Sequence, residues 1–171
     1  SEIHMSNHMG THIDFPSHVI KNGKSSSDYD INDLSGHGVV IDISLDMSSI
    51  TRESIATHCI KKDVIVLFKT RNAHLPKRGD IQTNYVYLEP DAARFLVDIG
   101  VKIVGIDYIS VDPIDSEQLP VHHHLLEHGI LIVENLNLKN IQSGSYHIQI
   151  APIHIPNMDG LPARVIMTRI P

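Results

Sequence analysis

Tryptophan is absent from this chain of 171 residues, and cysteine occurs only once, as Cys59. A single cysteine excludes a disulfide within the chain, which favours the cytoplasm as its compartment. Cys59 stands beside apolar residues, so we expect a packed thiol rather than a nucleophile. No apolar run approaches the roughly 18 residues that a membrane-spanning helix needs, and no signal peptide is visible. The sequence therefore predicts no membrane partner.

Positive charge is also scarce. Lysine and arginine number 14 against 20 aspartates and glutamates, and the net charge is -6 with the histidines neutral. A nucleic-acid-binding surface needs clustered lysine and arginine, so this balance argues against such a partner. With 42% hydrophobic and 20% charged residues, the composition is typical of a globular protein. We expect residues 1–171 to form a single catalytic domain.

Segments with the periodicity of strands and of helices alternate along the chain. We expect helices over 51–59, 91–100 and 120–127, and strands over 39–43, 64–70, 101–106, 130–133, 146–150 and 163–169. The alternation over 91–106 and again over 120–133 predicts an α/β fold. The further strands toward both ends indicate a mixed sheet rather than a purely parallel one.

Histidine is abundant, with 13 residues. Four of them lie within the first 18 positions, and three more are consecutive: His4, His8, His12 and His18, then His122, His123 and His124. Imidazole is the commonest side-chain metal ligand, so both groups are candidate metal-binding segments.

The first histidine group fits either of two local structures. His8 and His12 have the i, i+4 spacing of a helical metal pair, but Gly10 between them and Pro16 beyond them disfavour a helix. In an extended strand, His8, Gly10, His12 and Asp14 share one parity and face the same way. We therefore expect a strand that presents imidazoles and a carboxylate on one face.

His18 has the same parity but follows Pro16, which ends regular strand pairing, so the strand pattern does not fix its direction. Imidazoles and a carboxylate suit Zn²⁺, and nearly as well Mn²⁺ or Fe²⁺. A catalytic metal keeps one position open, so one of these groups could be a base rather than a ligand. The alternative interpretation is a polar strand that faces solvent.

The second histidine group is predicted on the helix that follows Pro120. His122, together with Glu134 at the end of the next strand, could complete a second metal position with Asp14 bridging two ions. Alternatively, Glu134 is a solvated charge at a strand end. We assign the remaining members of the group to the surface or to positions behind the ligands: His123, His124 and His128.

These residues resemble a family of metal-dependent cyclases and hydrolases that includes bacterial kynurenine formamidase (arylformamidase) and isatin hydrolase. The family hallmark His-x-Gly-Thr-His-x-Asp-x-Pro-x-His is matched in full by the run His8-Met9-Gly10-Thr11-His12-Ile13-Asp14-Phe15-Pro16-Ser17-His18. The similarity continues through 105–112, 122–138 and 159–164. It implies a swivelling β/β/α domain with a mixed sheet, assembled as a homodimer or homotetramer.

The resemblance also implies the ligands and the acid/base group. One divalent ion, Zn²⁺ or else Mn²⁺, would be held by His8, His12 and Asp14. A second would be held by Asp14, His122 and Glu134, and His18 would be the general acid/base. The family often has a small residue where this chain has Phe15, and its members usually carry a few tens of residues before the hallmark. We therefore expect that an N-terminal segment is missing from this chain.

Three functions are compatible with these residues. The first is hydrolysis of a linear or cyclic amide, in which a divalent ion lowers the pKa of its water to about 7. Hydroxide then attacks the carbonyl carbon, and His18 passes a proton to the leaving nitrogen. The second is a lyase or dehydratase that stabilises an enolate, and the third is a metal-binding protein without turnover.

The residues do not identify the substrate. Aromatic formyl amides such as N-formylkynurenine are the best-known substrates of the family that the sequence resembles. This chain has few aromatic residues to line a pocket for them, with three phenylalanines and five tyrosines. Phe15 and Tyr108 are the nearest candidates in sequence.

Overall fold

A closed, mixed barrel forms the centre of the computed structural model, which describes residues 1–76 and 80–170. The strand order around the barrel is β1-β7-β6-β4-β2-β8-β9. The strands are β1 (His12–Asp14), β2 (Ser35–Asp42), β4 (Ile65–Lys69), β6 (Ile103–Ile106), β7 (Leu131–Glu134), β8 (Gly144–Pro152) and β9 (Gly160–Arg169). β2, β4, β6 and β7 pair in parallel, whereas β1, β8 and β9 complete the circuit with antiparallel pairs. The α/β fold with a mixed sheet is thereby confirmed.

The remaining elements lie outside the barrel. A separate two-stranded parallel sheet joins β3 (Ser49–Ile50) and β5 (Tyr87–Leu88). The α-helices are α1 (Arg52–Ala56), α2 (Pro90–Ile99) and α3 (Pro120–Glu127), and the 3-10 helices are η1 (Pro16–His18), η2 (Ser26–Asp28) and η3 (Arg71–His74).

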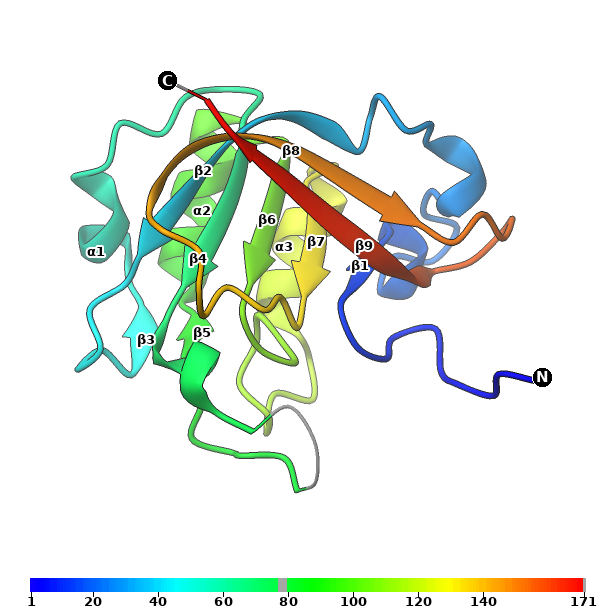
Figure 1. Cartoon of the computed structure of the whole chain (residues 1–171), viewed down its shortest axis with the longest axis horizontal. Helices are drawn as coiled ribbons and strands as arrows, with labels where there is room; N and C mark the ends of the chain where they lie inside the picture. The colour runs from blue at the N-terminus through cyan, green and yellow to red at the C-terminus, as the bar shows by residue number, and fades with distance from the viewer. Residues whose placement is uncertain (77–79, 171) are drawn as a thin grey trace.

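The parallel strands are covered on both faces. Figure 1 shows α2 and α3 behind β4, β6 and β7, with β8 and β9 crossing in front of them. Burial on both sides explains the continuous apolar run in β4, where Ile65 to Phe68 are fully buried. α2 begins at Pro90 and is terminated by Gly100 in the left-handed conformation, at φ 76°.

The helix expected over 51–59 is shorter than predicted. Thr51 caps α1, because its side chain accepts a hydrogen bond from the Ser54 amide at 3.2 Å. The helix then ends at Ala56, and Cys59 lies beyond it as a free, exposed thiol. The expectation that Cys59 is packed is wrong, because the helical turn that would bury it does not form.

The strand expected over the first histidine group is also shorter than predicted. Only His12–Asp14 forms strand β1, and the residues before it are in turn and bend conformations. Gly10 has φ +69°, a left-handed conformation that breaks the extended chain. His12 and Asp14 therefore share a strand face as predicted, whereas His8 does not belong to that strand.

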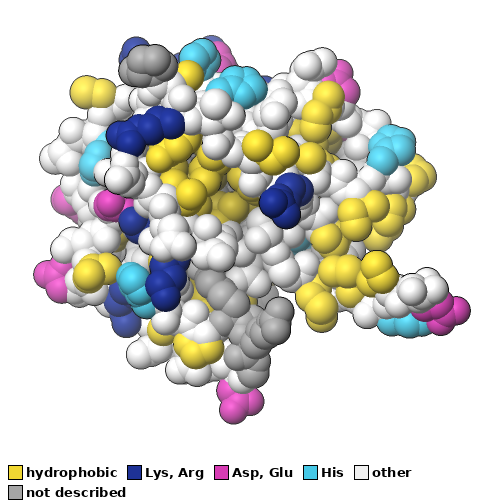
Figure 2. All heavy atoms as spheres, in the orientation of Figure 1, with side chains coloured by type: hydrophobic (Ala, Val, Ile, Leu, Met, Phe, Trp, Pro, Cys, Tyr) yellow, Lys and Arg dark blue, Asp and Glu magenta, His cyan; other side chains and the backbone are white. Residues whose placement is uncertain are grey.

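The segment ahead of this turn extends away from the barrel. Residues 1–6 have no regular secondary structure and project from the body of the molecule (Figures 1 and 2). Ile3 in this segment is 85% exposed. Within the ranges 1–76 and 80–170, no helix is both long enough and apolar enough to cross a membrane.

Candidate metal centre

Strand β1 closes the barrel between β7 and β9 and carries two candidate ligands. His12 lies opposite Glu134 of β7, and Asp14 lies opposite Gly160 of β9. Ile13, between them in sequence, points the other way into the core and is fully buried. The two-residue period of the strand thus directs both polar side chains to one side, where Glu134 meets them.

The first candidate ligand set consists of His8, His12 and Asp14. The Asp14 Oδ1 atom lies 2.7 Å from His8 Nδ1 and 3.3 Å from His12 Nε2. The turn at Gly10 brings His8 back toward the strand, and the Gly10 carbonyl accepts a hydrogen bond from His12 Nδ1 at 2.9 Å. In the neutral ring that bond places the proton on Nδ1 and the lone pair on Nε2, which is the form that binds a metal.

The second candidate ligand set consists of Asp14, His122 and Glu134. The His122 Nε2 atom lies 3.2 Å from Glu134 Oε1 and 3.8 Å from Asp14 Oδ2. His122 stands in the first turn of α3, and Glu134 is the last residue of β7. In each set the ligand atoms all lie within 4.8 Å of one another, and Asp14 belongs to both.

The fit of these residues to metal ions rests on one atom of Asp14. The side chain of Asp14 is fully buried, yet within the described residues its Oδ2 atom has no hydrogen-bond partner. A buried carboxylate oxygen without a partner is unfavourable unless a cation satisfies it. The donor set of imidazoles and carboxylates suits a transition-metal ion. The residues therefore fit a divalent metal ion, and Asp14 belongs to both candidate ligand sets.

The pKa values of the same groups show a strong attraction for positive charge. Burial alone would lower the pKa of His12 and of His122. Instead, hydrogen bonds and the charges of nearby carboxylates raise them to about 9 and about 10. Burial also opposes the ionisation of Asp14, but hydrogen bonds from His12 and His8 hold its pKa well below the usual range. Burial and the neighbouring Asp14 charge raise the pKa of Glu134.

His18 lies beside the first ligand set rather than inside it. It is the last residue of η1, and its ring centroid is 4.1 Å from that of His8 and 5.6 Å from that of His122. Its side chain is 25% exposed, so a bound molecule can reach it. Burial lowers the pKa of His18, although the Asp14 charge opposes the shift.

Asp159 is a further residue of this region, and it was not among the predicted site residues although it lies in the stretch 159–164 that resembles the family. Its Oδ2 atom lies 3.6 Å from His18 Nδ1 and 3.4 Å from His8 Nε2. His8, His18 and Asp159 also have ligand atoms that all lie within 4.8 Å of one another. The geometry is thus compatible with His18 as an acid/base group oriented by Asp159, or with His18 as a ligand.

Behind the second ligand set lies Asp112, which is fully buried and was also missed. Its Oδ2 atom accepts a hydrogen bond from His122 Nδ1 at 2.7 Å, so His122 Nε2 faces the other carboxylates. The two Asp112 oxygens also accept hydrogen bonds from the amides of Val121 and His122 at 3.0 Å. On Glu134, Oε1 accepts a hydrogen bond from the Val111 amide at 2.8 Å. Such outer partners fix the direction of a metal ligand.

The two aromatic residues proposed to contact substrate are both packed in the interior. Phe15 is 1% exposed, and its ring centroid lies 5.4 Å from that of Tyr29. Tyr108 is also 1% exposed, and its hydroxyl accepts a hydrogen bond from the Gln82 amide at 3.0 Å. Substrate contact by Phe15 or Tyr108 remains a prediction.

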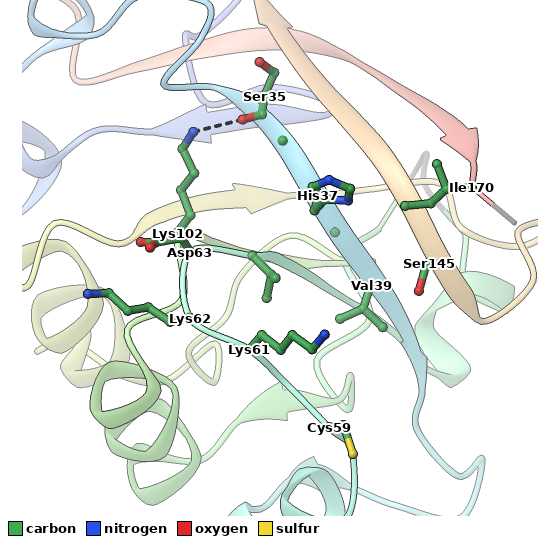
Figure 3. A pocket seen from close by; sticks show the side chains of 13 residues that line it. Ser35, His37, Val39, Cys59, Lys61, Lys62, Asp63, Lys102, Ser145 and Ile170 are labelled. Carbon is green, nitrogen blue, oxygen red and sulfur yellow. Dashed lines mark hydrogen bonds between the residues drawn. The ribbon is translucent and has the colours of Figure 1, made fainter.

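A cavity of about 780 Å³ lies away from the candidate ligands. It is lined by residues at the beginnings of β2, β4 and β6, whereas Glu134 stands at the end of β7, which runs parallel to β6. Figure 3 shows Lys102 reaching Ser35 in this cavity, with Cys59 at its border; Lys102 Nζ donates a hydrogen bond to the Ser35 carbonyl at 2.9 Å. The cavity contains none of the predicted site residues, so it is not part of the candidate metal centre.

Comparisons with known proteins find relatives over nearly the whole chain. Residues 1–113 match the family model Cyclase, described as "Putative cyclase". The chain is 35% identical to a kynurenine formamidase of Salinibacter ruber, over 99% of this chain and 79% of that protein. It is 36% identical to a kynurenine formamidase of Bacillus cytotoxicus, over 97% and 78%.

Solved structures show the same fold. A potential metal-dependent hydrolase with cyclase activity matches with TM-score 0.91 and 34% identity, over 99% of this chain and 83% of that one. Isatin hydrolase A from Labrenzia aggregata, bound to benzyl benzoate, matches with TM-score 0.82 and 28% identity, over 96% and 74%.

Proposed function

This chain belongs to the Cyclase family, and from that premise we propose that it hydrolyses amide C–N bonds at a centre of two divalent metal ions. The observation that carries the proposal is the buried Oδ2 atom of Asp14, which accepts no hydrogen bond from any described residue and belongs to the carboxylate shared by two ligand sets. One set is His8, His12 and Asp14, and the other is Asp14, His122 and Glu134. Zn²⁺ is the proposed metal because imidazole and carboxylate donors suit it, with Mn²⁺ as the alternative.

Bound there, divalent ions supply Lewis acidity, which polarises a carbonyl and makes water more acidic. The chain's own contribution is to hold the ligands rigidly and to transfer one proton. Asp112 fixes the ring of His122, and the Val111 amide fixes the carboxylate of Glu134. Because these groups are already in place, little reorganisation is needed when substrate binds.

His18 is the proposed general acid/base. Its ring lies next to His8 and is partly exposed, so it can reach both water and an amide above the ligand sets. As water adds to the carbonyl carbon, the neutral imidazole accepts a proton from it. The same proton then passes to the nitrogen as the C–N bond breaks, giving a carboxylic acid and an amine. Asp159, 3.6 Å from His18 Nδ1, orients the ring for this transfer.

The substrate class we propose is a formyl amide of an aromatic amine, with a cyclic aryl amide as the second choice. The first follows the kynurenine formamidases that this chain resembles, and the second follows the isatin hydrolase. A homodimer or homotetramer in the cytoplasm remains the expected assembly and location, and light scattering of the purified protein tests the assembly.

Metal analysis followed by an activity screen tests the proposal. The purified protein is loaded with Zn²⁺ or Mn²⁺ and assayed against formyl-aryl amides, cyclic aryl amides and small lactones. We expect turnover of an amide that disappears on chelation and returns with added metal. Elimination or dehydration without water uptake would instead identify a lyase, and stoichiometric metal without turnover would identify a binding protein. Either outcome would overturn the hydrolase proposal.

A further inference from the structure

Helix α3 carries histidines on more than one side, and only His122 belongs to the candidate metal centre. His122 is buried and points toward Asp14 and Glu134. His124 and His128 stand one helical turn apart, at the carboxyl-terminal end of α3. Residues at i and i+4 on a helix are neighbours on its surface. We propose that His124 and His128 form a separate binding site for one divalent transition-metal ion. Zn²⁺ is the ion we expect there.

The arrangement of the two rings supports this site. Their centroids are 4.8 Å apart, with an angle of 52° between the ring planes. Two imidazole nitrogens bound to one Zn²⁺ at about 2.0–2.1 Å and a tetrahedral angle place the ring centroids roughly 5 Å apart. The observed separation is therefore close to that of a chelating pair.

The hydrogen bonding of the two rings leaves nitrogen lone pairs available. His128 Nδ1 lies 2.8 Å from the backbone carbonyl of His124, which can only accept, so Nδ1 carries the proton. The neutral ring then presents its Nε2 lone pair. The Nε2 atom of His124 is buried from solvent and has no hydrogen-bond partner in the part of the chain that the structure describes. A bound ion would satisfy both nitrogens.

The position of the pair at the end of α3 also favours a cation. The last turn of a helix carries partial negative charge on its free carbonyls, which attracts positive charge.

This site is independent of the proposed hydrolysis, and its test needs no substrate. Zn²⁺ is titrated into the purified protein by calorimetry, and bound zinc is counted after desalting. The test variant is His128→Gln, which retains a side-chain donor for the His124 carbonyl but lacks the imidazole nitrogen. The control is His123→Ala, an exposed histidine on the same helix.

We expect His128→Gln to bind one zinc ion fewer per chain than wild type, and His123→Ala to bind the wild-type number. Amide hydrolysis, if present in wild type, should be unchanged in His128→Gln. His124→Ala should lose the same ion, and circular dichroism checks that α3 is retained in both variants. Equal zinc stoichiometry and affinity in wild type and His128→Gln would overturn the proposal. That result would leave the metal centre at Asp14 untouched.

Discussion

Asp112 accepts a hydrogen bond from His122 Nδ1 at 2.7 Å, and through it the opposite nitrogen of the ring is aimed at Glu134. The same carboxylate accepts hydrogen bonds from the backbone amides of Val121 and His122 at the start of α3. One buried side chain thus anchors a helix terminus and orients a candidate ligand on that helix.

Replacing Asp112 should weaken metal binding without removing a ligand. We expect Asp112→Asn to lower zinc affinity by about 10- to 100-fold, because Asn has one accepting oxygen where the carboxylate uses two and so cannot bind both the His122 ring and the Val121 amide. Competition with a chromogenic chelator measures the affinity. Asp115→Asn, an exposed aspartate in the same loop, is the control and should behave as wild type. Unchanged affinity in Asp112→Asn would mean that the ring is oriented by the ions alone.

Replacing His18 should separate catalysis from metal binding. We expect His18→Ala to reduce kcat by about 10²- to 10⁴-fold, the usual contribution of a general acid/base, while zinc content stays at the wild-type value. His37→Ala, an exposed histidine on β2, serves as the control for surface histidine loss. If His18→Ala loses zinc together with activity, then His18 is a ligand in company with His8 and Asp159.

Asp159 should act on the reaction through His18. Removal of the carboxylate in Asp159→Ala should lower kcat about tenfold, with a smaller effect on KM, because the His18 ring loses its orientation. Asp159→Asn retains an oxygen that can accept the His18 proton and should recover part of the rate. A drop in zinc content in both variants would instead assign Asp159 to the ligands.

A side chain at Gly160 should push aside the ring of His8. A Cβ atom added there would clash with that ring. We expect Gly160→Ala to displace that ring, with a stability cost of about 1–3 kcal/mol from overpacking and a loss of the ion held by His8 and His12. Thermal unfolding and zinc titration measure the two effects.

The double variant His8→Ala/Gly160→Ala provides the matched control. Removing the ring relieves the clash, so stability should return while the ion remains lost. If the double variant is as unstable as Gly160→Ala, a clash with the His8 ring is not the cause of the lost stability.

Local periodicity was enough to predict part of β1 but not the approach of His8. The alternation of His12, Ile13 and Asp14 correctly placed two polar residues on one face, because a half-buried strand requires that pattern. The turn at Gly10 is also a local feature, but glycine adopts extended and left-handed conformations about equally readily. The sequence could not show which one Gly10 takes.

The supporting carboxylates could not be predicted, for a different reason. Asp112 and Asp159 act on histidines that lie next to them only in the folded chain. Asp159 stands in the connection before β9. It is so far from His18 in the sequence that no local pattern predicts their contact. The strand order is likewise a tertiary property: β1 pairs with β7 and β9, which follow far along the chain.

The position of β1 in the barrel has a consequence for how the molecule is made. Synthesis delivers β1 well before its two neighbours in the barrel, β7 and β9. Contacts between segments so distant in sequence form late in folding, because closing a long loop costs chain entropy. His12 and Asp14 are therefore synthesised well before Glu134, and the second ligand set is complete only once β1 has paired with β7.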